Sequence, residues 1–314
     1  MDECIEAVRS ALTELAGGEA IQPLRPVVWL PEGALGMMPG YLPSIDTIGI
    51  KTITVFPGNA GTPYDSHQGT VMLFDGEFGR LTAVIDATEI TAIRTAAASA
   101  VATDALARPD ASVLAILGSG VQAGTHLDAM AAVRPVTEVR IWSRSPANAV
   151  RLAASTARDG VEVRAVSTVA EAVGGADLVC TTTASHEPVL PGFLLEAGMH
   201  INAVGASIPT ARELDGEALA RSRLFVDRRE SALNEAGDFL LARQEGHVSD
   251  ADIVAEVGEV LTGSAPGRQT DEEITLFKSL GLAVEDIAAG DLVYRKALAA
   301  NVGVSLELGG ARHA

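Results

Sequence analysis

The segment Ala115–Ala123, AILGSGVQA, joins an apolar stretch to the start of a helical pattern. Gly118 allows a tight turn out of a strand, and Gly120 lets the backbone approach a diphosphate held at a helix N-terminus. Ala123 stands where helix–strand packing requires a small residue. Because the motif lies between an expected strand and an expected helix, it predicts a dinucleotide-binding turn. A purely structural turn is the alternative.

Apolar strands alternate with helical patterns on both sides of this turn. The expected strands are Ser112–Leu117, Val136–Trp142, Val161–Val166, Leu178–Thr182, His200–Val204 and Leu224–Val226. This alternation predicts βαβ units and an α/β fold with a Rossmann-type, doubly wound parallel sheet. After Asp250 the pattern predicts mainly helix.

The first third of the chain has a different rhythm. An amphipathic helix ends at Gly17-Gly18, and a long Ala-rich helix is expected over 88–107. Between them, strands are expected at Pro26–Leu30, Asp46–Phe56, Gly69–Phe74 and Leu81–Asp86. We therefore expect two domains: an N-terminal mixed α+β domain for substrate binding and dimerisation over 1–108, and a nucleotide-binding Rossmann domain over 109–285. A final helix at about 286–314 is expected to return to the first domain.

Charge and cysteine content narrow the class of protein. The 314 residues include 23 Lys and Arg against 41 Asp and Glu, which gives a net charge of −18. Such a chain repels phosphate backbones and anionic lipids, so we expect no nucleic-acid or membrane partner. Cys4 and Cys180 have no disulfide or metal spacing, and the acidic N-terminus lacks signal-peptide features, which predicts a cytoplasmic protein. The six histidines show no metal-ligand spacing, and no metal site is expected.

The end of the second Rossmann strand predicts which cofactor binds. NAD sites usually place Asp or Glu there to bind the ribose diol. This chain has Ser143-Arg144-Ser145 instead. A guanidinium flanked by hydroxyls suits a 2′-phosphate, so NADPH is favoured, with NADH as the alternative.

Three cations before the Rossmann domain lie in apolar surroundings. Arg94 is the single charge within 90–103, and Lys51 is flanked by apolar strand residues. Arg25 lies in the segment Gln22-Pro23-Leu24-Arg25-Pro26. Buried cations need anions, so these residues predict a clamp for a ligand carboxylate. Ion pairs with Asp or Glu are the alternative.

Asp227 directly follows the apolar strand Leu224–Val226. Ligands of doubly wound sheets bind at the carboxyl ends of the strands, where a carboxylate can exchange a proton beside a nicotinamide. Capping the next helix, or pairing with a neighbouring arginine, is the alternative role.

Segments spread over nearly the whole chain resemble the ornithine cyclodeaminase/mu-crystallin family. In addition to Lys51 in its strand, they are MPGY at 38–41, SHQG at 66–69, TAIRTAA at 91–97, GSGVQA at 118–123, VRIWSR at 139–144, HINAVGAS at 200–207, RELD at 212–215, EVGEV at 256–260, FKSLG at 277–281 and Glu285-Asp286. The resemblance implies a homodimer whose N-terminal domain carries the substrate pocket and the subunit interface.

The resemblance also implies roles for individual residues. Arg25, Lys51 and Arg94 would hold a substrate carboxylate, and Met38 would contact the substrate. Asp227, as the catalytic aspartate, and Lys51 would be the catalytic residues. The implied cofactor residues are Ser66, Thr95, Gly118, Gly120, Val121, Gln122, Ser143, Arg144, Ser145, Thr182, Val204, Ser207, Ser279 and Leu280.

Two departures bear on the activity. Ornithine cyclodeaminases of the family carry an acidic residue just before the Met-Pro pair, whereas this chain has Gly36-Met37-Met38-Pro39. The Ser143-Arg144-Ser145 tip resembles that of NADPH-binding members. We therefore expect an oxidoreductase that reduces a C=N bond next to a carboxylate, for example in Δ1-piperideine-2-carboxylate or Δ1-pyrroline-2-carboxylate. Ornithine cyclodeamination, alanine dehydrogenation, reductive amination and non-enzymatic, NADPH-dependent ligand binding are the alternatives.

Overall fold

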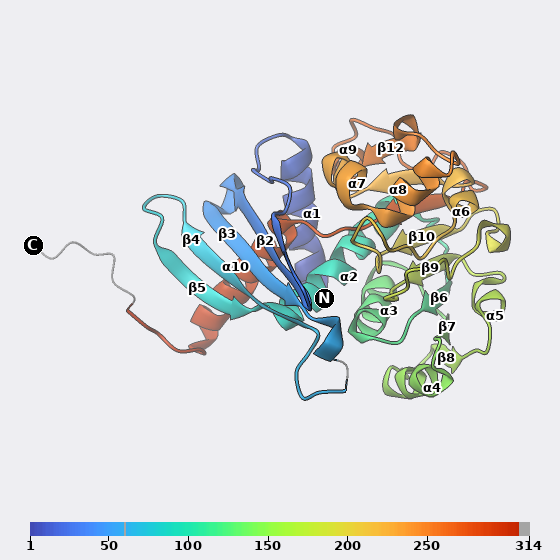
Figure 1. Cartoon of the computed structure of the whole chain (residues 1–314), viewed down its shortest axis with the longest axis horizontal. Coiled ribbons are helices and arrows are strands. Elements are labelled where there is room, and N and C mark those ends of the chain that lie inside the picture. Colours follow the sequence, from blue (N-terminus) through green and yellow to red (C-terminus); the bar gives the residue numbers. More distant parts are fainter. Residues whose placement is uncertain (60, 308–314) are drawn as a thin grey trace, which may run out of the picture.

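The computed structural model describes residues 1–59 and 61–307. Helix α1 (Asp2–Ala16) precedes an antiparallel five-stranded sheet whose strands follow each other in chain order. These strands are β1 (Val27–Leu30), β2 (Gly33–Leu42), β3 (Thr47–Val55), β4 (His67–Asp75) and β5 (Leu81–Asp86). The long helix α2 (Ala87–Leu106) then leads into the second half of the molecule (Figure 1).

The second half is an eight-stranded sheet in which every pair of neighbours is parallel. In spatial order the strands are β12 (Ile253–Glu256), β11 (Arg223–Val226), β13 (Thr275–Lys278), β10 (His200–Ala203), β9 (Leu178–Thr181), β6 (Val113–Leu117), β7 (Glu138–Trp142) and β8 (Glu162–Ala165). The chain runs from β6 to β8 in one direction and then returns to β9 on the other side of β6. This reversal confirms the doubly wound, Rossmann-type sheet.

Helices cover both faces of the parallel sheet. The helices are α3 (Val121–Val133), α4 (Pro146–Ser155), α5 (Val169–Val173), α6 (Gly216–Ala220), α7 (Arg229–Glu235), α8 (Gly237–Gln244) and α9 (Val257–Leu261). Residues of α2, α3 and α4 share one buried apolar cluster, and residues of α5, α6, α7 and α8 share another. Successive strand residues alternate between the clusters, as the two-residue period of a strand requires.

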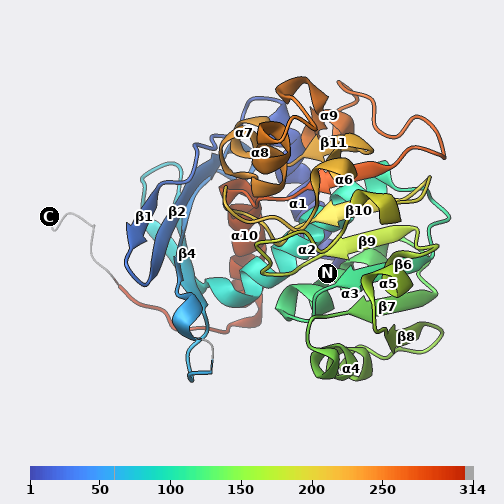
Figure 2. The same cartoon turned by 45° about the vertical axis from the view of Figure 1, so that its right-hand side comes forward.

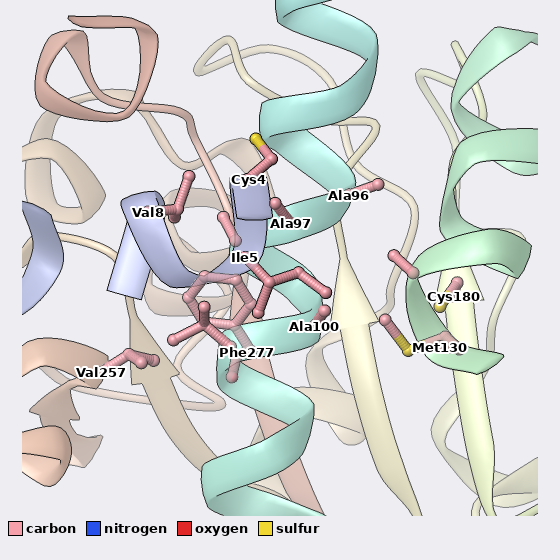
Figure 3. Close-up of a cluster of buried hydrophobic side chains, with 14 of the residues drawn as sticks. Cys4, Ile5, Val8, Ala96, Ala97, Ala100, Met130, Cys180, Val257 and Phe277 are labelled. Carbon is pink, nitrogen blue, oxygen red and sulfur yellow. The ribbon is translucent and has the colours of Figure 1, made fainter. Parts of the chain in front are cut away.

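Helix α2 links the two halves because it is buried on nearly all sides. Fourteen of its 20 residues are buried, and it contacts α1, α3, β4, β10 and β13. Figure 3 shows Ile5 and Val8 of α1, Ala97 and Ala100 of α2 and Phe277 of β13 gathered in one cluster. The small alanine side chains let neighbouring elements approach α2 closely, so the sheets share one core.

The last helix, α10 (Ala283–Ala300), packs against β2, β3 and β4 and against α1 and α2 (Figure 2). Two strand glycines make this close approach possible. A Cβ added to Gly49 would lie 2.5 Å from Cγ1 of Ile287, and one added to Gly40 would lie 3.1 Å from Cδ1 of the same residue. The packing places the first turn of α10, with Glu285 and Asp286, under the antiparallel sheet. Residues 308–314 of the expected final segment lie outside the described residues.

Two parts of the chain differ from the sequence-based prediction. Strand β2 is not among the expected strands, because its glycines and Pro39 are typical of turns, but glycine also occurs where another backbone or helix approaches a strand closely. The prediction of mainly helix after Asp250 agrees with α9 and α10 but misses the two short strands β12 and β13. Strand β13 has only four residues and ends in a lysine, so a local pattern does not show that it occupies the middle of the sheet. Among the described residues, no helix is long and apolar enough to cross a membrane.

Candidate functional site at the carboxyl edge of the parallel sheet

Six of the proposed site residues directly follow the last residue of a parallel strand. They are Gly118 after β6, Ser143 after β7, Thr182 after β9, Val204 after β10, Asp227 after β11 and Ser279 after β13. Because parallel strands end at the same edge of a sheet, these residues form one row. The row includes the ends of the neighbouring strands β6 and β9, where the strand order reverses, and doubly wound sheets bind their ligands at this point.

The turn after β6 has the shape that a dinucleotide requires. Gly118 has φ +136°, and a Cβ there would lie 2.5 Å from Oγ1 and 2.7 Å from the carbonyl oxygen of Thr182. Gly118 therefore lets the ends of β6 and β9 touch. At Gly120, the N-cap of α3, an added Cβ would meet no heavy atom of the described chain within 4 Å. This open space above a helix N-terminus fits a diphosphate, so the residues fit a nicotinamide dinucleotide.

The end of β7 presents hydroxyls and a guanidinium beside this turn. Ser143 Oγ lies 2.8 Å from Ser119 Oγ and accepts a hydrogen bond from the Ser145 N–H at 3.3 Å. Arg144 is exposed, and no carboxylate of the described residues pairs with it. A surface cavity of about 630 Å³ opens next to Ser119 and is lined by Asn148 and Arg151 of α4. The edge of the sheet here is polar and cationic.

Glu213 fixes the ends of strands β9 and β10. This buried carboxylate accepts hydrogen bonds from Thr181 Oγ1 at 2.6 Å, from the Thr183 N–H at 2.5 Å and from the Gly205 N–H at 2.7 Å. One side chain thus connects the loop after β9 to the loop after β10. Its own backbone N–H is held by Asp238 at 2.7 Å. The rigid support of these loops keeps Thr182 and Val204 in the row.

A buried ion-pair cluster lies where α2, β3 and α10 meet. Asp286 accepts Lys51 Nζ at 2.9 Å and Arg94 Nε at 2.8 Å on the same oxygen, Oδ1. Glu285 Oε2 accepts Arg94 Nη1 at 2.9 Å. Lys51 and Arg94 are 2% and 4% exposed, and both carboxylates are fully buried. The two cations therefore lie side by side on one carboxylate. The ion pairs with Asp or Glu that the sequence analysis gives as the alternative for these cations are present in the structure.

The turn after β13 joins this cluster to Asp227. The carboxylate of Asp227 accepts the N–H groups of Leu280 at 2.5 Å and Gly281 at 2.8 Å. Arg25 donates to the Leu280 carbonyl at 3.0 Å and pairs with Glu235 at 2.7 Å. At Gly281, with φ +80°, an added Cβ would lie 2.5 Å from Arg94 Nη1. One three-residue turn is thus in contact with Arg25, Arg94 and Asp227.

Burial shifts the pKa values of the ionisable groups in this region. It raises the pKa of Asp227 above its ordinary value, although three backbone N–H groups and Arg25 act in the opposite direction. It lowers the pKa of Lys51 to about 8, assisted by the Arg94 charge and opposed by Asp286. Both shifts bring groups of the site toward neutral pH, where proton exchange is efficient.

The remaining proposed residues divide into two groups. Met38 is the cross-strand neighbour of Lys51, Thr95 follows Arg94 on α2, and Gln122 donates to the Thr91 carbonyl at 3.3 Å, so these three lie at the cluster or the turn. Val121 is exposed at the first residue of α3, and Ser207 is half-buried in the loop after β10. Ser66 lies in the loop before β4, where its hydroxyl is 3.0 Å from His67 Nδ1, and no contact with the cluster is observed among the described residues.

Comparison with known proteins agrees with this geometry. The model of the ornithine cyclodeaminase/mu-crystallin family matches residues 1–301. The chain belongs to this family. Ketimine reductase mu-crystallin of Mus musculus is 45% identical over 292 residues, covering 92% of this chain and 90% of that one.

Two solved structures of family members superpose closely on the chain. One is Δ1-pyrroline-2-carboxylate reductase of Thermococcus litoralis in complex with NADH and L-proline, with a TM-score of 0.95, 38% identity and coverage of 98% of this chain and 96% of that one. The other is an archaeal alanine dehydrogenase dimer with bound NAD, with a TM-score of 0.94, 35% identity and coverage of 98% and 95%.

The sequence predicts a role for Asp227 but not for the other carboxylates of the site. Glu213, Glu285 and Asp286 belong to the segments that carry the resemblance, without a predicted role, and Glu235 is not among the predicted residues. A signal was present, because Glu285 and Asp286 interrupt the apolar stretch that runs from Leu280 to Ala289. The same argument that singled out Arg94 applies to them: a charge in an apolar helix needs a partner. Among the described residues, no group of His, Cys, Asp and Glu side chains is arranged to hold a metal.

We expect Gly281→Ala to disturb the site through Arg94. The substitution places a non-glycine residue at φ +80° and a methyl group against the guanidinium. Gly175→Ala is the matched control, because Gly175 has φ +67° and an added Cβ there would meet no described heavy atom within 4 Å. Both variants are expected to lose about 1–2 kcal/mol of unfolding free energy in urea.

Only Gly281→Ala should weaken the binding of pyrrole-2-carboxylate, a planar ring acid, measured by calorimetry. A lost hydrogen bond between charged groups corresponds to about tenfold or more in Kd. Equal affinities for the two variants would show that the position of Arg94 does not matter for carboxylate binding.

Proposed function

We propose that the protein is a nicotinamide-dependent imine reductase that acts on a C=N bond next to a carboxylate. The observation that carries the proposal is the contact between the two halves of the site: Arg94 lies against Gly281, whose N–H binds Asp227. A carboxylate-binding pair and a proton-exchanging carboxylate thus lie on either side of one glycine, at the edge where the dinucleotide turn is found.

The cations would bind and orient the substrate. Asp286 holds Lys51 and Arg94 together, so both can donate to the two oxygens of one carboxylate. Arg25 reaches the same turn through the Leu280 carbonyl. Holding a substrate in reactive geometry is worth about 7–11 kcal/mol of a reaction barrier. The burial of both cations excludes water, which strengthens their attraction for an anion.

Asp227 would hold the proton that the nitrogen needs. A bound reduced nicotinamide supplies a hydride, which carries two electrons to the imine carbon. The hydride forms the new C–H bond, the π electrons of the C=N bond move to nitrogen, and a proton on nitrogen completes the amine. Because burial raises the pKa of Asp227, this carboxyl keeps a proton at a higher pH than an exposed aspartate does, and so has one available for the nitrogen.

The names of the relatives support this reaction class. The mouse relative is named a ketimine reductase, and the Thermococcus litoralis relative is a Δ1-pyrroline-2-carboxylate reductase. We propose cyclic imino acids of the same kind, Δ1-piperideine-2-carboxylate and Δ1-pyrroline-2-carboxylate, as substrates. The Gly36-Met37 sequence before the Met-Pro pair argues against ornithine, because it supplies no carboxylate for a distal amine.

Absorbance at 340 nm with NADPH or NADH tests the function. We expect oxidation with the two cyclic imino acids, and a loss of kcat by about 100-fold or more in Asp227→Asn with cofactor affinity kept. Asp177→Asn is the control, because Asp177 also accepts two backbone N–H groups but lies at the opposite edge of the sheet. Ammonia release from L-ornithine with NAD would instead identify a cyclodeaminase. NADH oxidation with pyruvate and ammonia would identify an alanine dehydrogenase. Binding of the imino acids without turnover would identify a ligand-binding protein.

We propose NADPH as the preferred cofactor on the basis of Arg144. Its guanidinium is exposed beside Ser143 and Ser145 at the end of β7, where the ribose 2′ position binds in this fold. Arg144→Ala is expected to raise the KM for NADPH about tenfold or more, and to leave the KM for NADH within about twofold. Arg158→Ala, which removes a surface arginine paired with Asp128, is the control. Equal effects on both cofactors would contradict the assignment.

We also propose that the protein is a homodimer. The outer face of the antiparallel sheet, opposite α10, exposes Val28, Ile48 and Val84 at 46%, 40% and 57%. An exposed apolar face of this kind marks an interface, and one solved relative is described as a dimer. Light scattering should give twice the chain mass of 32.4 kDa, whereas the mass of a single chain would contradict the proposal.

A further inference from the structure

The buried cluster contains more acidic than basic side chains. Lys51 and Arg94 pair with Glu285 and Asp286, and Asp227 is joined to Arg94 through Gly281. Each of these five charged side chains is at most 4% exposed. The separate pair of Arg25 with Glu235 is neutral. If all of these groups are ionised, the site repels the carboxylate that it is proposed to bind. Charges at such short range and low dielectric interact strongly, so the excess must be relieved when an anion binds.

Among the three carboxylates, Glu285 has the fewest partners. Asp227 accepts three backbone N–H groups, and Asp286 is paired with both Lys51 and Arg94. Glu285 has one hydrogen bond, from Arg94 to Oε2, while its buried Oε1 has no partner within the described chain. A carboxylate oxygen buried without a donor is costly as an anion, but it is a natural position for a proton.

We propose that Glu285 takes up a proton when the substrate carboxylate binds to Lys51 and Arg94. This inference rests on the proposed function for the nature of the substrate. An entering carboxylate competes for the Arg94 N–H that now stabilises Glu285, and it adds a further negative charge to the cluster. Protonation of Glu285 relieves both effects, so binding of the anion and of the proton are coupled.

The coupling also balances the proposed reaction. Reduction of an imine consumes one hydride and one proton, and the nicotinamide supplies only the hydride. If the site takes up a proton together with the substrate, the complex of protein, cofactor and substrate contains both the hydride and the proton that the reaction consumes. Glu285 is suited to this role because burial raises its pKa to about 7, with Asp227 and Asp286 reinforcing the effect and Arg94 opposing it.

The other ionisable groups around Glu285 respond differently near pH 7. Cys4 of α1 stays a neutral thiol because burial raises its pKa to about 11. Lys51 of β3, with a pKa of about 8, is already mostly charged. His67, at the start of β4, has a pKa lowered by burial and by the Lys51 charge, so it is mostly neutral. Asp227, whose pKa burial also raises, and His67 are the remaining competing sites of proton uptake, and the variants must exclude both.

Calorimetry of pyrrole-2-carboxylate binding measures the coupled proton directly. This acid is an anion near neutral pH, and its aromatic ring does not accept hydride. Titration of the full chain with NADPH present, at pH 7 in phosphate and in Tris, gives the number of protons from the difference in buffer ionisation heats. Because Glu285 with a pKa of about 7 is half ionised at this pH, we expect uptake of about half a proton per bound acid.

Variants identify the group that takes up the proton. Glu285→Gln keeps the size of the side chain and is expected to abolish uptake at pH 7, whereas His67→Asn is expected to keep it. Loss of uptake in His67→Asn, or its persistence in Glu285→Gln, would overturn the assignment to Glu285. Failure of the wild-type chain to bind the acid would reject the carboxylate site and with it the coupling.

A second measurement needs no variant. The Kd of the wild-type protein for pyrrole-2-carboxylate should rise about fourfold between pH 6 and pH 7.5, because the free protein loses the proton of Glu285 over this range. A Kd that is constant over this range would overturn the proposal. Turnover of the cyclic imino acids is measured separately, so failure of the reaction and failure of the proton coupling are distinguishable.

Discussion

The carboxylate of Asp286 is the contact on which the site depends. Through one oxygen it binds Lys51 from the antiparallel sheet and Arg94 from α2, and it belongs to α10, the last helix of the chain. Three elements that are far apart in sequence therefore meet at one buried charge. Isolated cations in this position would carry a large desolvation cost, so the carboxylate both permits their burial and sets the distance between them.

The close approach of α10 to the sheet makes this contact possible. Gly40 and Gly49 remove the side chains that would otherwise separate Ile287 from β2 and β3. On the other side of the cluster, Gly281 lets the turn after β13 touch the Arg94 guanidinium. The glycines thus allow the close approach that the charged groups need, because they bring backbone and charged groups within hydrogen-bonding distance in a core that excludes water.

The row of residues along the parallel sheet supplies the other half of the site. It follows from topology, since every parallel strand ends at the same edge and the strand order reverses between β6 and β9. Glu213 fixes two of the loops in that row, and Gly281 joins Asp227 to the ion-pair cluster. The proposed chemistry is therefore located where a nucleotide-binding edge meets a carboxylate-binding cluster.

The sequence alone determined the Rossmann-type sheet, its glycine turn and the unusual setting of Lys51 and Arg94, because these depend on local patterns of apolar residues, glycine and isolated charge. It did not reveal β2 or β13, in which glycines and a terminal lysine are explained only by close neighbours elsewhere in the chain. Nor did it reveal that Glu285 and Asp286 bind those cations. These ion pairs join residues 191 and 192 positions apart in the sequence. Which charges become partners, and at what distance, is decided by the elements that the fold packs together.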